Sequence, residues 1–214
     1  MRKIKILIDD LDSWMIPYGK ILKEKLNHKG YITELINSHD DINSGYCLFL
    51  LSCSRKLKKL DAFRYNIVIH ASDLSRGKGW SPLTWQILEG KNSIPISVFE
   101  ANEKIDAGKI YIKTYLKLLG YELIEEIREK LYIEIENLIF RFLDMDKSKA
   151  IEQTGEETFY SRRNKEDSEL DIKKSIESQF NLLRVCDNEK YPAFFNYGDQ
   201  KFILKIYKSE DDKF

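Results

Sequence analysis

The stretch from Asn66 to Ile110 decides the predicted fold, and it reads NIVIHASDLSRGKGWSPLTWQILEGKNSIPISVFEANEKIDAGKI. An apolar run near its start, residues 67–69, is typical of a buried strand and ends at His70. A second apolar run, residues 94–99, leads into the acidic loop Glu100–Asp106. The stretch therefore predicts two strands of one sheet, each followed by polar side chains.

A short helix between the two runs is predicted from the residues at its ends. The glycine-spaced loop Ser75–Gly79 comes first, Ser81 takes the N-cap position, and Pro82 takes the first helical position, where a missing N–H costs no hydrogen bond. Gly90 is predicted to close the helix, because glycine adopts the left-handed conformation found just after many helices.

If both strands end at the same edge of the sheet, His70 and Asp106 meet there. Histidine titrates near neutral pH, and a histidine beside a carboxylate is a common arrangement for moving protons. A lone histidine at a strand end is more often structural. The pairing with Asp106 is therefore what favours a proton-transfer site.

Length and charge limit the class of protein. The 214 residues can form one large domain, or one domain with a small appendage. The 35 basic and 35 acidic residues balance, which argues against binding nucleic acid or a membrane surface through bulk positive charge. The three cysteines lie far apart and lack metal-type spacing, as in a reducing cytoplasm. No apolar run is long enough for a signal peptide or a membrane span, so we expect a soluble cytoplasmic protein.

Predicted strands and helices alternate along the first two thirds of the chain. This alternation predicts an α/β fold with a Rossmann-like, mainly parallel sheet and helices on both faces, although the dinucleotide motif G-x-G-x-x-G is absent. Ligands of such sheets bind outside the carboxyl ends of the strands. The predicted strands are residues 4–8, 31–36, 46–51 and 66–69 with an edge strand at 109–113, and the predicted helices are 18–27 and 121–145.

The composition shifts after residue 145. Residues 146–171 are highly charged and are predicted to be a linker or a surface loop that crosses to a second unit. A helix is predicted over 172–185, followed by a hairpin around Asn196–Asp199. We therefore expect a catalytic domain at 1–145 and a linker with a small helix–hairpin subdomain at 146–214. The aromatic residues of the hairpin, if unpacked, make a homodimer plausible.

The central stretch resembles the formyltransferases that use 10-formyltetrahydrofolate. The residues HASDLSRGKGWSP, from His70 to Pro82, are similar to the family's signature, and Asp106-Ala107-Gly108 is similar to its Asp-x-Gly motif. Arg162-Arg163, Asn181–Arg184 and Tyr191–Phe194 are similar to the family's second domain. Within the family, the chain looks like the sugar-nucleotide N-formyltransferases of the pseudaminic-acid type.

The resemblance implies roles for particular residues. His70 and Asp106 match the family's catalytic histidine and aspartate, but its catalytic asparagine is replaced by Val68. Asn66 faces the same side of the strand, roughly 6–7 Å further back, and does not replace it. The family likeness and the side-chain chemistry together suggest a co-substrate site at Ser52, Cys53, Ser54, Lys78, Asn102, Glu103, Lys104, Ile105 and Asp106, and a substrate site at Ser72, Arg76, Trp80, Tyr160, Arg162 and Arg163.

The activity implied by the resemblance is transfer of a formyl group to the amine of a nucleotide-linked amino sugar, with a UDP-4-amino-4,6-dideoxy sugar of bacterial surface glycan biosynthesis expected. The reaction implies no metal, no nucleic acid and no membrane. Several readings stay open. Trp80 is also a candidate core residue, Arg76 and Lys78 a solvated loop, and residues 159–163 a solvated linker. The alternative functions are formylation of an aminoacyl-tRNA or a carrier-bound amino acid, and a non-catalytic binding module.

Overall fold

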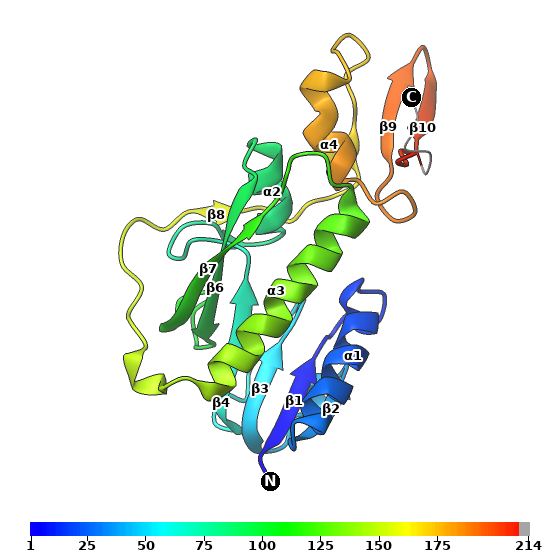
Figure 1. Cartoon of the computed structure of the whole chain (residues 1–214). Coiled ribbons are helices and arrows are strands. Elements are labelled where there is room, and N and C mark those ends of the chain that lie inside the picture. Colours follow the sequence, from blue (N-terminus) through cyan, green and yellow to red (C-terminus); the bar gives the residue numbers. More distant parts are fainter. Residues whose placement is uncertain (210–214) are drawn as a thin grey trace.

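The computed structural model describes residues 1–209. A six-stranded sheet forms its centre, with the spatial order β2-β1-β3-β4-β6-β7 (Figure 1). The first four strands pair in parallel, which confirms the α/β class with a mainly parallel sheet. The bounds are β1 Lys3–Leu7, β2 Ile32–Ile36, β3 Gly45–Leu50, β4 Phe63–His70, β6 Ser93–Glu100 and β7 Ile110–Lys117.

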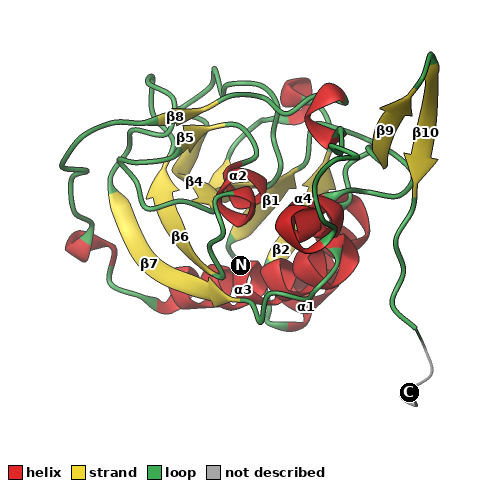
Figure 2. Ribbon diagram, turned by 90° about the horizontal axis from the view of Figure 1, so that it is seen from above, coloured by secondary structure: helices red, strands yellow, loops and turns green. Residues whose placement is uncertain are grey.

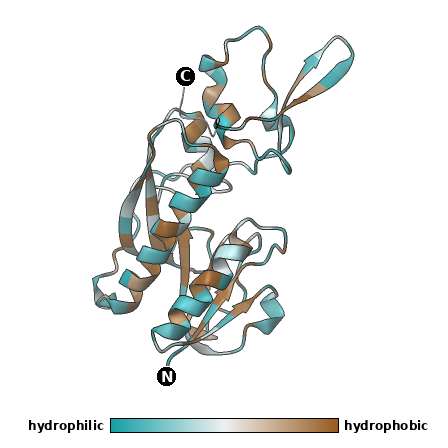
Figure 3. Ribbon diagram, turned by 45° about the vertical axis from the view of Figure 1, so that its right-hand side comes forward, coloured by the Kyte–Doolittle hydropathy of each residue, from teal (hydrophilic) through white to brown (hydrophobic). Residues whose placement is uncertain are grey.

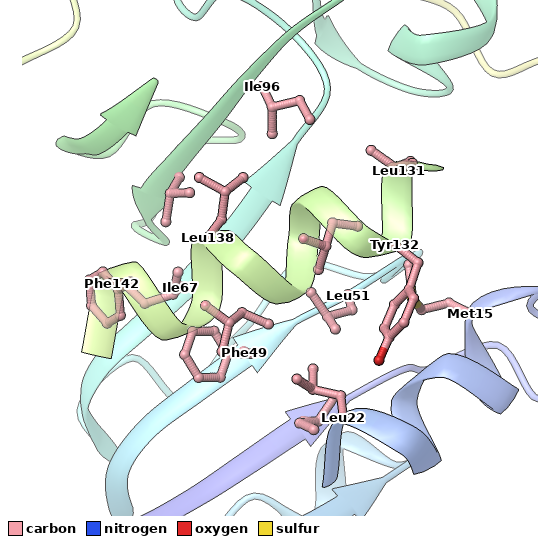
Figure 4. Close-up of a cluster of buried hydrophobic side chains, with 14 of the residues drawn as sticks. Met15, Leu22, Phe49, Leu51, Ile67, Ile96, Leu131, Tyr132, Leu138 and Phe142 are labelled. Atoms are coloured by element: carbon pink, nitrogen blue, oxygen red, sulfur yellow. The ribbon is translucent and has the colours of Figure 1, made fainter. Parts of the chain in front are cut away.

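Two helices cover one face of this sheet, as seen from above in Figure 2. They are α1, Met15–His28, and α3, Ile124–Asp144. The apolar stripe of α3 lies against the strands, with Leu138 and Phe142 fully buried and Phe142 edge-on to Phe49 at a centroid distance of 6.0 Å (Figure 4). Each such side chain contributes about 1.5–3 kcal/mol by leaving water, so this layer is the main source of stability.

Helices are predicted on both faces, but the second face is covered mainly by loops and a short 3-10 helix, His39–Asp41. Leu7, Leu48 and Leu50 point to this face, because alternate strand residues point to opposite sides. Figure 3 shows that hydrophobic residues are concentrated in the central strands. Within residues 1–209, no helix combines the length and hydrophobicity needed to cross a membrane.

The direction of β6 differs from the prediction. β6 runs antiparallel to β4, so that His70 lies opposite Ser97 and Ile67 lies opposite Glu100. The carboxyl end of β6 is therefore not at the edge of the sheet where His70 lies. The prediction that both strands end at the same edge is wrong. The loop of residues 101–109 instead returns along the sheet and brings Asp106 to His70. β7 pairs with β6 as the predicted edge strand.

The helix α2 spans Pro82–Leu88 and begins at the predicted proline. Gly90 has φ +87° and follows the helix as predicted. Ser81 takes the N-cap position as predicted, but it adopts a left-handed conformation, φ 49°, and its side chain makes no cap hydrogen bond. This unusual backbone turns the chain sharply between Trp80 and the helix.

Residues 151–162, which we call the strap, leave α3 and cross the sheet edge (Figure 1). A short strand within it, β8 Phe159–Tyr160, pairs in parallel with β5, Lys78–Gly79, in the glycine-spaced loop. An isolated bridge joins Ile151 to Ile110. The strap is thus bound to the central stretch by its backbone at both ends.

Most of the remaining residues form short elements. Only part of the predicted helix over 172–185 forms, as the 3-10 helix Glu177–Gln179 and α4, Phe180–Val185. The side-chain amide of Gln179 binds the carbonyls of Asp171, Lys174 and Ser175, which keeps the preceding segment in a loop. The predicted hairpin is confirmed as β9, Ala193–Tyr197, and β10, Gln200–Leu204. A further 3-10 helix spans Lys147–Lys149 and another spans Glu166–Ser168.

Candidate active site

His70 and Asp106 form the centre of the candidate site. The Nε2 atom of His70 lies 3.7 Å from Oδ2 of Asp106, and the two side chains are 12% and 14% exposed. Nε2 also lies 3.1 Å from the carbonyl oxygen of Gly77. Because a carbonyl can only accept a hydrogen bond, Nε2 carries the hydrogen. In the neutral ring, Nδ1 is then the nitrogen that can take a proton.

Asp106 is held by contacts on several sides. Its Oδ2 accepts a hydrogen bond of 2.9 Å from the backbone N–H of Gly79, and its main-chain oxygen accepts one of 3.0 Å from Nε2 of Gln153. Its φ is +49°, in the left-handed region that costs a non-glycine residue of order 1–3 kcal/mol. Such strain persists only where surrounding contacts enforce it, and here they aim the carboxylate at His70.

Gln153 is a contact that the sequence did not indicate. Its amide donates to the main-chain oxygens of both Asp106 and Gly108, at 3.0 and 2.8 Å. A glutamine in a charged segment carries no motif, and its role depends on the path of the strap. A Cβ added to Gly108 would lie 1.7 Å from the oxygen of Glu100, so glycine is required at the third position of the Asp-x-Gly motif.

The other strained residues also flank this pair. The non-glycine residues with positive φ in the described chain are Ser52, Ser81 and Asp106. Ser52 follows β3, and its hydroxyl accepts a hydrogen bond of 3.0 Å from the Ser13 hydroxyl. Strained backbone clusters at functional sites, so its concentration around His70 independently favours this region as a site.

Two backbone segments predicted to bind the co-substrate lie near one another. The ammonium of Lys56 donates to the main-chain oxygen of Glu103 and so joins the segment after β3 to the loop of residues 101–109. Cys53 and Ala101 pack on the same apolar cluster as Val68. Residues 52–54 and 102–106 belong to no helix or strand, so their backbone polar groups take no part in helix or sheet pairing, and side chains bind some of them, including the Ser54 and Lys104 N–H groups and the Glu103 oxygen.

Individual members of these segments differ in their surroundings. Burial raises the pKa of the Cys53 thiol to about 12, and its Sγ donates to the oxygen of Leu7, so the thiol is not a nucleophile. The side chain of Asn102 accepts from the backbone N–H of Lys104 and shapes the turn. Ile105 is exposed next to Asp106.

The strap fixes the glycine-spaced loop. The Ser75 hydroxyl donates to the oxygens of Thr154 and Glu156 at 3.1 and 3.0 Å, and the Gly77 N–H donates to the Thr158 hydroxyl at 2.9 Å. Since Gly77 accepts a hydrogen bond from His70, the strap holds the residue that orients the His70 ring. The Lys78 ammonium is buried and lies 2.5 Å from Glu157, so in this structure it is already engaged by the strap.

The residues predicted to bind substrate fall into two groups. Arg162 lies over the exposed ring of Trp80, with Cζ 5.0 Å from the ring centroid, and the Tyr160 hydroxyl donates to Glu89 at 2.7 Å. Exposed Arg76 lies 3.7 Å from Glu156 on the strap.

Arg163 and Ser72 are instead turned inward. Arg163, the residue after the strap, donates to the oxygen of Val185 and the hydroxyl of Ser168 and thereby binds the chain there to the C-terminal elements. The Ser72 hydroxyl is buried and has no hydrogen-bond partner within residues 1–209.

Val68, at the position of the family's asparagine, has apolar surroundings. It packs with Leu74, Phe99 and Ile110. The amide of Asn66 is committed elsewhere, because Nδ2 donates to the oxygen of Leu60 at 2.8 Å. The side chains around His70 on this strand therefore include no amide that could replace the missing one.

Two surface hollows lie apart from the His70–Asp106 pair. One, of about 940 Å³, is lined by β7 and α3, and the other, of about 600 Å³, by Arg2, Arg64 and neighbouring tyrosines. The site is thus defined by side-chain geometry and not by these hollows. In the described part of the chain, no group of three or more His, Cys, Asp or Glu side chains is arranged to hold a metal ion.

Known proteins share sequence and fold with this chain. The chain matches no protein-family model. It is 26% identical, over 95% of its length, to the bifunctional polymyxin resistance protein ArnA of Wigglesworthia glossinidia brevipalpis, of which it covers 33%. The chain spans a third to about half the length of the curated relatives it matches.

Two solved structures show the same fold over almost their full length. Methionyl-tRNA formyltransferase from Clostridium thermocellum is 27% identical with a TM-score of 0.82, over 100% of this chain and 96% of that one. A likely sugar N-formyltransferase from Mycobacterium tuberculosis covers 100% of both chains at 14% identity, with a TM-score of 0.74, and shares the fold. Along nearly all of its sequence and fold, the chain is therefore similar to a formyltransferase of known structure.

Proposed function

We propose that this protein transfers a formyl group from 10-formyltetrahydrofolate to the amine of a nucleotide-linked amino sugar, with a UDP-4-amino-4,6-dideoxy sugar of the pseudaminic-acid type as the expected acceptor. The observation that carries the proposal is the contact of His70 with Asp106, at 3.7 Å, beside the two backbone segments of residues 52–54 and 102–106. These segments come from distant parts of the sequence.

The residues around the pair fit a pterin ring. A flat heteroaromatic ring needs apolar contact on its faces and hydrogen-bonding groups along its edges. Cys53, Val68 and Ala101 offer the apolar contact, and the backbone of residues 52–54 and 102–105 offers the polar groups. When bound there, 10-formyltetrahydrofolate supplies the formyl group.

His70 is proposed to move the proton of the acceptor amine. An attacking amine must lose a proton, and Nδ1 of His70 can take it because Nε2–H is held by the Gly77 carbonyl. Asp106 then stabilises the imidazolium, by on the order of 4 kcal/mol before desolvation for unit charges at this distance. The strap keeps both partners in place through Gly77 and Gln153.

Val68 places a limit on the rate. Acyl transfer builds negative charge on an oxygen, and losing one hydrogen-bond donor to that oxygen costs about 2.7–4 kcal/mol. The side chain of Val68 has no hydrogen-bond donor, so the charge must be stabilised by His70 in its protonated form, by backbone N–H groups or by water.

Trp80 and Arg162 support a nucleotide-linked acceptor. The exposed Trp80 ring can stack on a base, and the Arg162 guanidinium above it can bind a diphosphate with two parallel hydrogen bonds. The balanced charge of the chain gives no broad positive face for a tRNA. Formylation of methionyl-tRNA is nevertheless the second candidate, because the 27% identical Clostridium thermocellum structure carries that name.

Isotope-labelled formyl transfer tests the proposal. Labelled 10-formyltetrahydrofolate is incubated with the protein and with UDP- and dTDP-amino sugars or methionyl-tRNA. We expect label on a sugar nucleotide. Label on methionyl-tRNA alone would favour the second candidate, and binding without turnover would favour a non-catalytic module.

A histidine variant tests the catalytic role. His70→Asn is expected to lower kcat at least 100-fold, whereas His28→Asn on the exposed side of α1 is the matched control and should leave kcat unchanged. Turnover by His70→Asn close to that of the wild type would refute the role of His70.

We also propose that the hairpin forms a homodimer contact. Tyr197, Phe202 and Ile203 are 68%, 45% and 55% exposed, and Phe202 stacks on Phe195 at a centroid distance of 5.4 Å. Sedimentation velocity on the wild type and on Ile203→Asp tests this. A monomeric wild type at micromolar concentration would refute it.

A further inference from the structure

Asp9 is a buried acid that no motif accounts for. It lies just beyond the carboxyl end of β1, next to the end of β3, where Leu7 pairs with Leu50. Its side chain is 0% exposed. An ionised carboxylate is costly to bury unless its oxygens are hydrogen-bonded, so its partners indicate its task.

Those partners lie mainly on the segment after β3. Oδ1 accepts a hydrogen bond of 2.6 Å from the Ser54 N–H, and Oδ2 accepts one of 3.0 Å from the Arg55 N–H. Nε2 of His39 lies 3.0 Å from Oδ2, and Nε of Arg55 lies 3.9 Å from it. Burial by itself would raise the pKa of Asp9, but the hydrogen bonds from Ser54, His39 and Arg55 outweigh burial and lower it, so the group is ionised at neutral pH.

This clasp fixes a backbone that has no other regular support. Residues 51–54 belong to no strand or helix, and Ser52 is in the left-handed region at φ 57°. The Ser13 hydroxyl donates a hydrogen bond to the Ser52 hydroxyl, and the main-chain oxygen of Leu7 accepts one from the Cys53 thiol. Asp9 is the group that binds two successive backbone N–H groups of the segment, and a carboxylate is suited to this because both of its oxygens only accept.

We propose that Asp9 is a positioning residue: through the N–H groups of Ser54 and Arg55 it holds the backbone of residues 52–54 in the form that receives the pterin ring. This inference rests on the proposed function. Asp9, at the end of the first strand of the sheet, thereby raises the affinity for 10-formyltetrahydrofolate, although it does not touch the reacting atoms. His39, from the segment after β2, completes the clasp.

Asp9→Asn tests the inference with little change in volume. An asparagine has one accepting oxygen and one NH₂ group, so its NH₂ must face a backbone N–H or His39. We expect KM for 10-formyltetrahydrofolate to rise at least tenfold with kcat within threefold of the wild type. Asp10→Asn, at an exposed neighbour, is the matched control and should leave both constants unchanged. An unchanged KM in folded Asp9→Asn would overturn the inference.

Hydrogen exchange separates this inference from the proposed function. In Asp9→Asn, the amides of Ser54 and Arg55 should exchange at least tenfold faster while those of β4 stay protected. If the wild-type protein neither binds tetrahydrofolate nor transfers formyl, the proposed function is refuted. Hydrogen exchange at Ser54 and Arg55 would still show whether Asp9 holds this backbone. If Asp9→Asn does not fold, His39→Ala removes one partner of the clasp. It should raise KM two- to threefold, and an unchanged KM would overturn the inference.

Discussion

Glu122→Gln is predicted to weaken the attachment of the C-terminal elements to the sheet. Glu122 lies in the turn between β7 and α3 and its side chain is 1% exposed. Its oxygens accept hydrogen bonds from the N–H groups of Leu119 and Gly120 and from the ammonium of Lys130. Oε2 also lies 3.5 Å from the guanidinium of Arg184 on α4, whose side chain is 0% exposed.

The size of the effect follows from the pKa of Glu122. Burial acts to raise this pKa, but the hydrogen bonds from Lys130 and from the backbone outweigh burial and lower it from 4.5 to about 2. At 1.36 kcal/mol per unit, ionised Glu122 contributes about 3 kcal/mol to the free energy of unfolding at pH 7. Because the folded-state pKa is lowered, this contribution is complete above pH 4.5 and is lost as the pH falls towards 2. About 1.4 kcal/mol remains at pH 3.

Urea unfolding of the wild type and of Glu122→Gln at pH 7 and pH 3 measures these values. The difference in unfolding free energy should be about 3 kcal/mol at pH 7 and should fall by about half at pH 3. Glu129→Gln, at an exposed position on α3, is the control and should cost less than about 1 kcal/mol. A difference below about 1 kcal/mol at pH 7, or one that does not change with pH, would refute the reasoning.

Three further predictions concern the candidate site. Gly108→Ala should lower the unfolding free energy by about 1–3 kcal/mol or more and abolish formyl transfer, because its Cβ would lie 1.7 Å from the oxygen of Glu100. Urea unfolding and the transfer assay measure these two effects, and wild-type values for both would contradict the prediction. Val68→Asn introduces an amide side chain at the position of the family's asparagine and should raise kcat at least tenfold. The unfolding free energy should fall by about 1–3 kcal/mol, because a polar group replaces an apolar one in a packed cluster. An unchanged kcat would show that the missing hydrogen-bond donor does not limit the rate. The Cys53 thiol should resist iodoacetamide at pH 8 in the native protein and react in urea, as followed by mass spectrometry, because its pKa is raised to about 12; rapid native alkylation would exclude that pKa.

Local patterns predicted much of the fold correctly. The apolar runs, the proline-started helix and the hairpin each appear close to their predicted positions. The direction of β6 could not be predicted, because an apolar run reads the same in a parallel and an antiparallel strand. The proximity of His70 and Asp106 was therefore expected for a reason that is wrong, since the return of residues 101–109 brings them together.

The contacts of the charged segment were harder to foresee. Residues 146–171 have the composition of a linker, yet the strap binds the glycine-spaced loop through main-chain oxygens of Thr154, Glu156 and Thr158. Backbone groups are the same in every residue, so composition says little about such pairing. Lys78 and Arg163 likewise have partners that the sequence does not indicate, namely Glu157 on the strap for Lys78 and Ser168 beyond it for Arg163.

The strap also has a consequence for synthesis of the chain. The loop that orients His70 is tied to Thr158, 81 residues later in the sequence. A ribosome-bound chain that ends before residue 151 therefore contains both His70 and Asp106 but none of the contacts that the strap gives them. Such long-range pairings form late, because a large loop must close first. We expect the pair to reach its working geometry only after the strap has left the ribosome, so the order of synthesis keeps the nascent enzyme inactive until the last third of the chain is made.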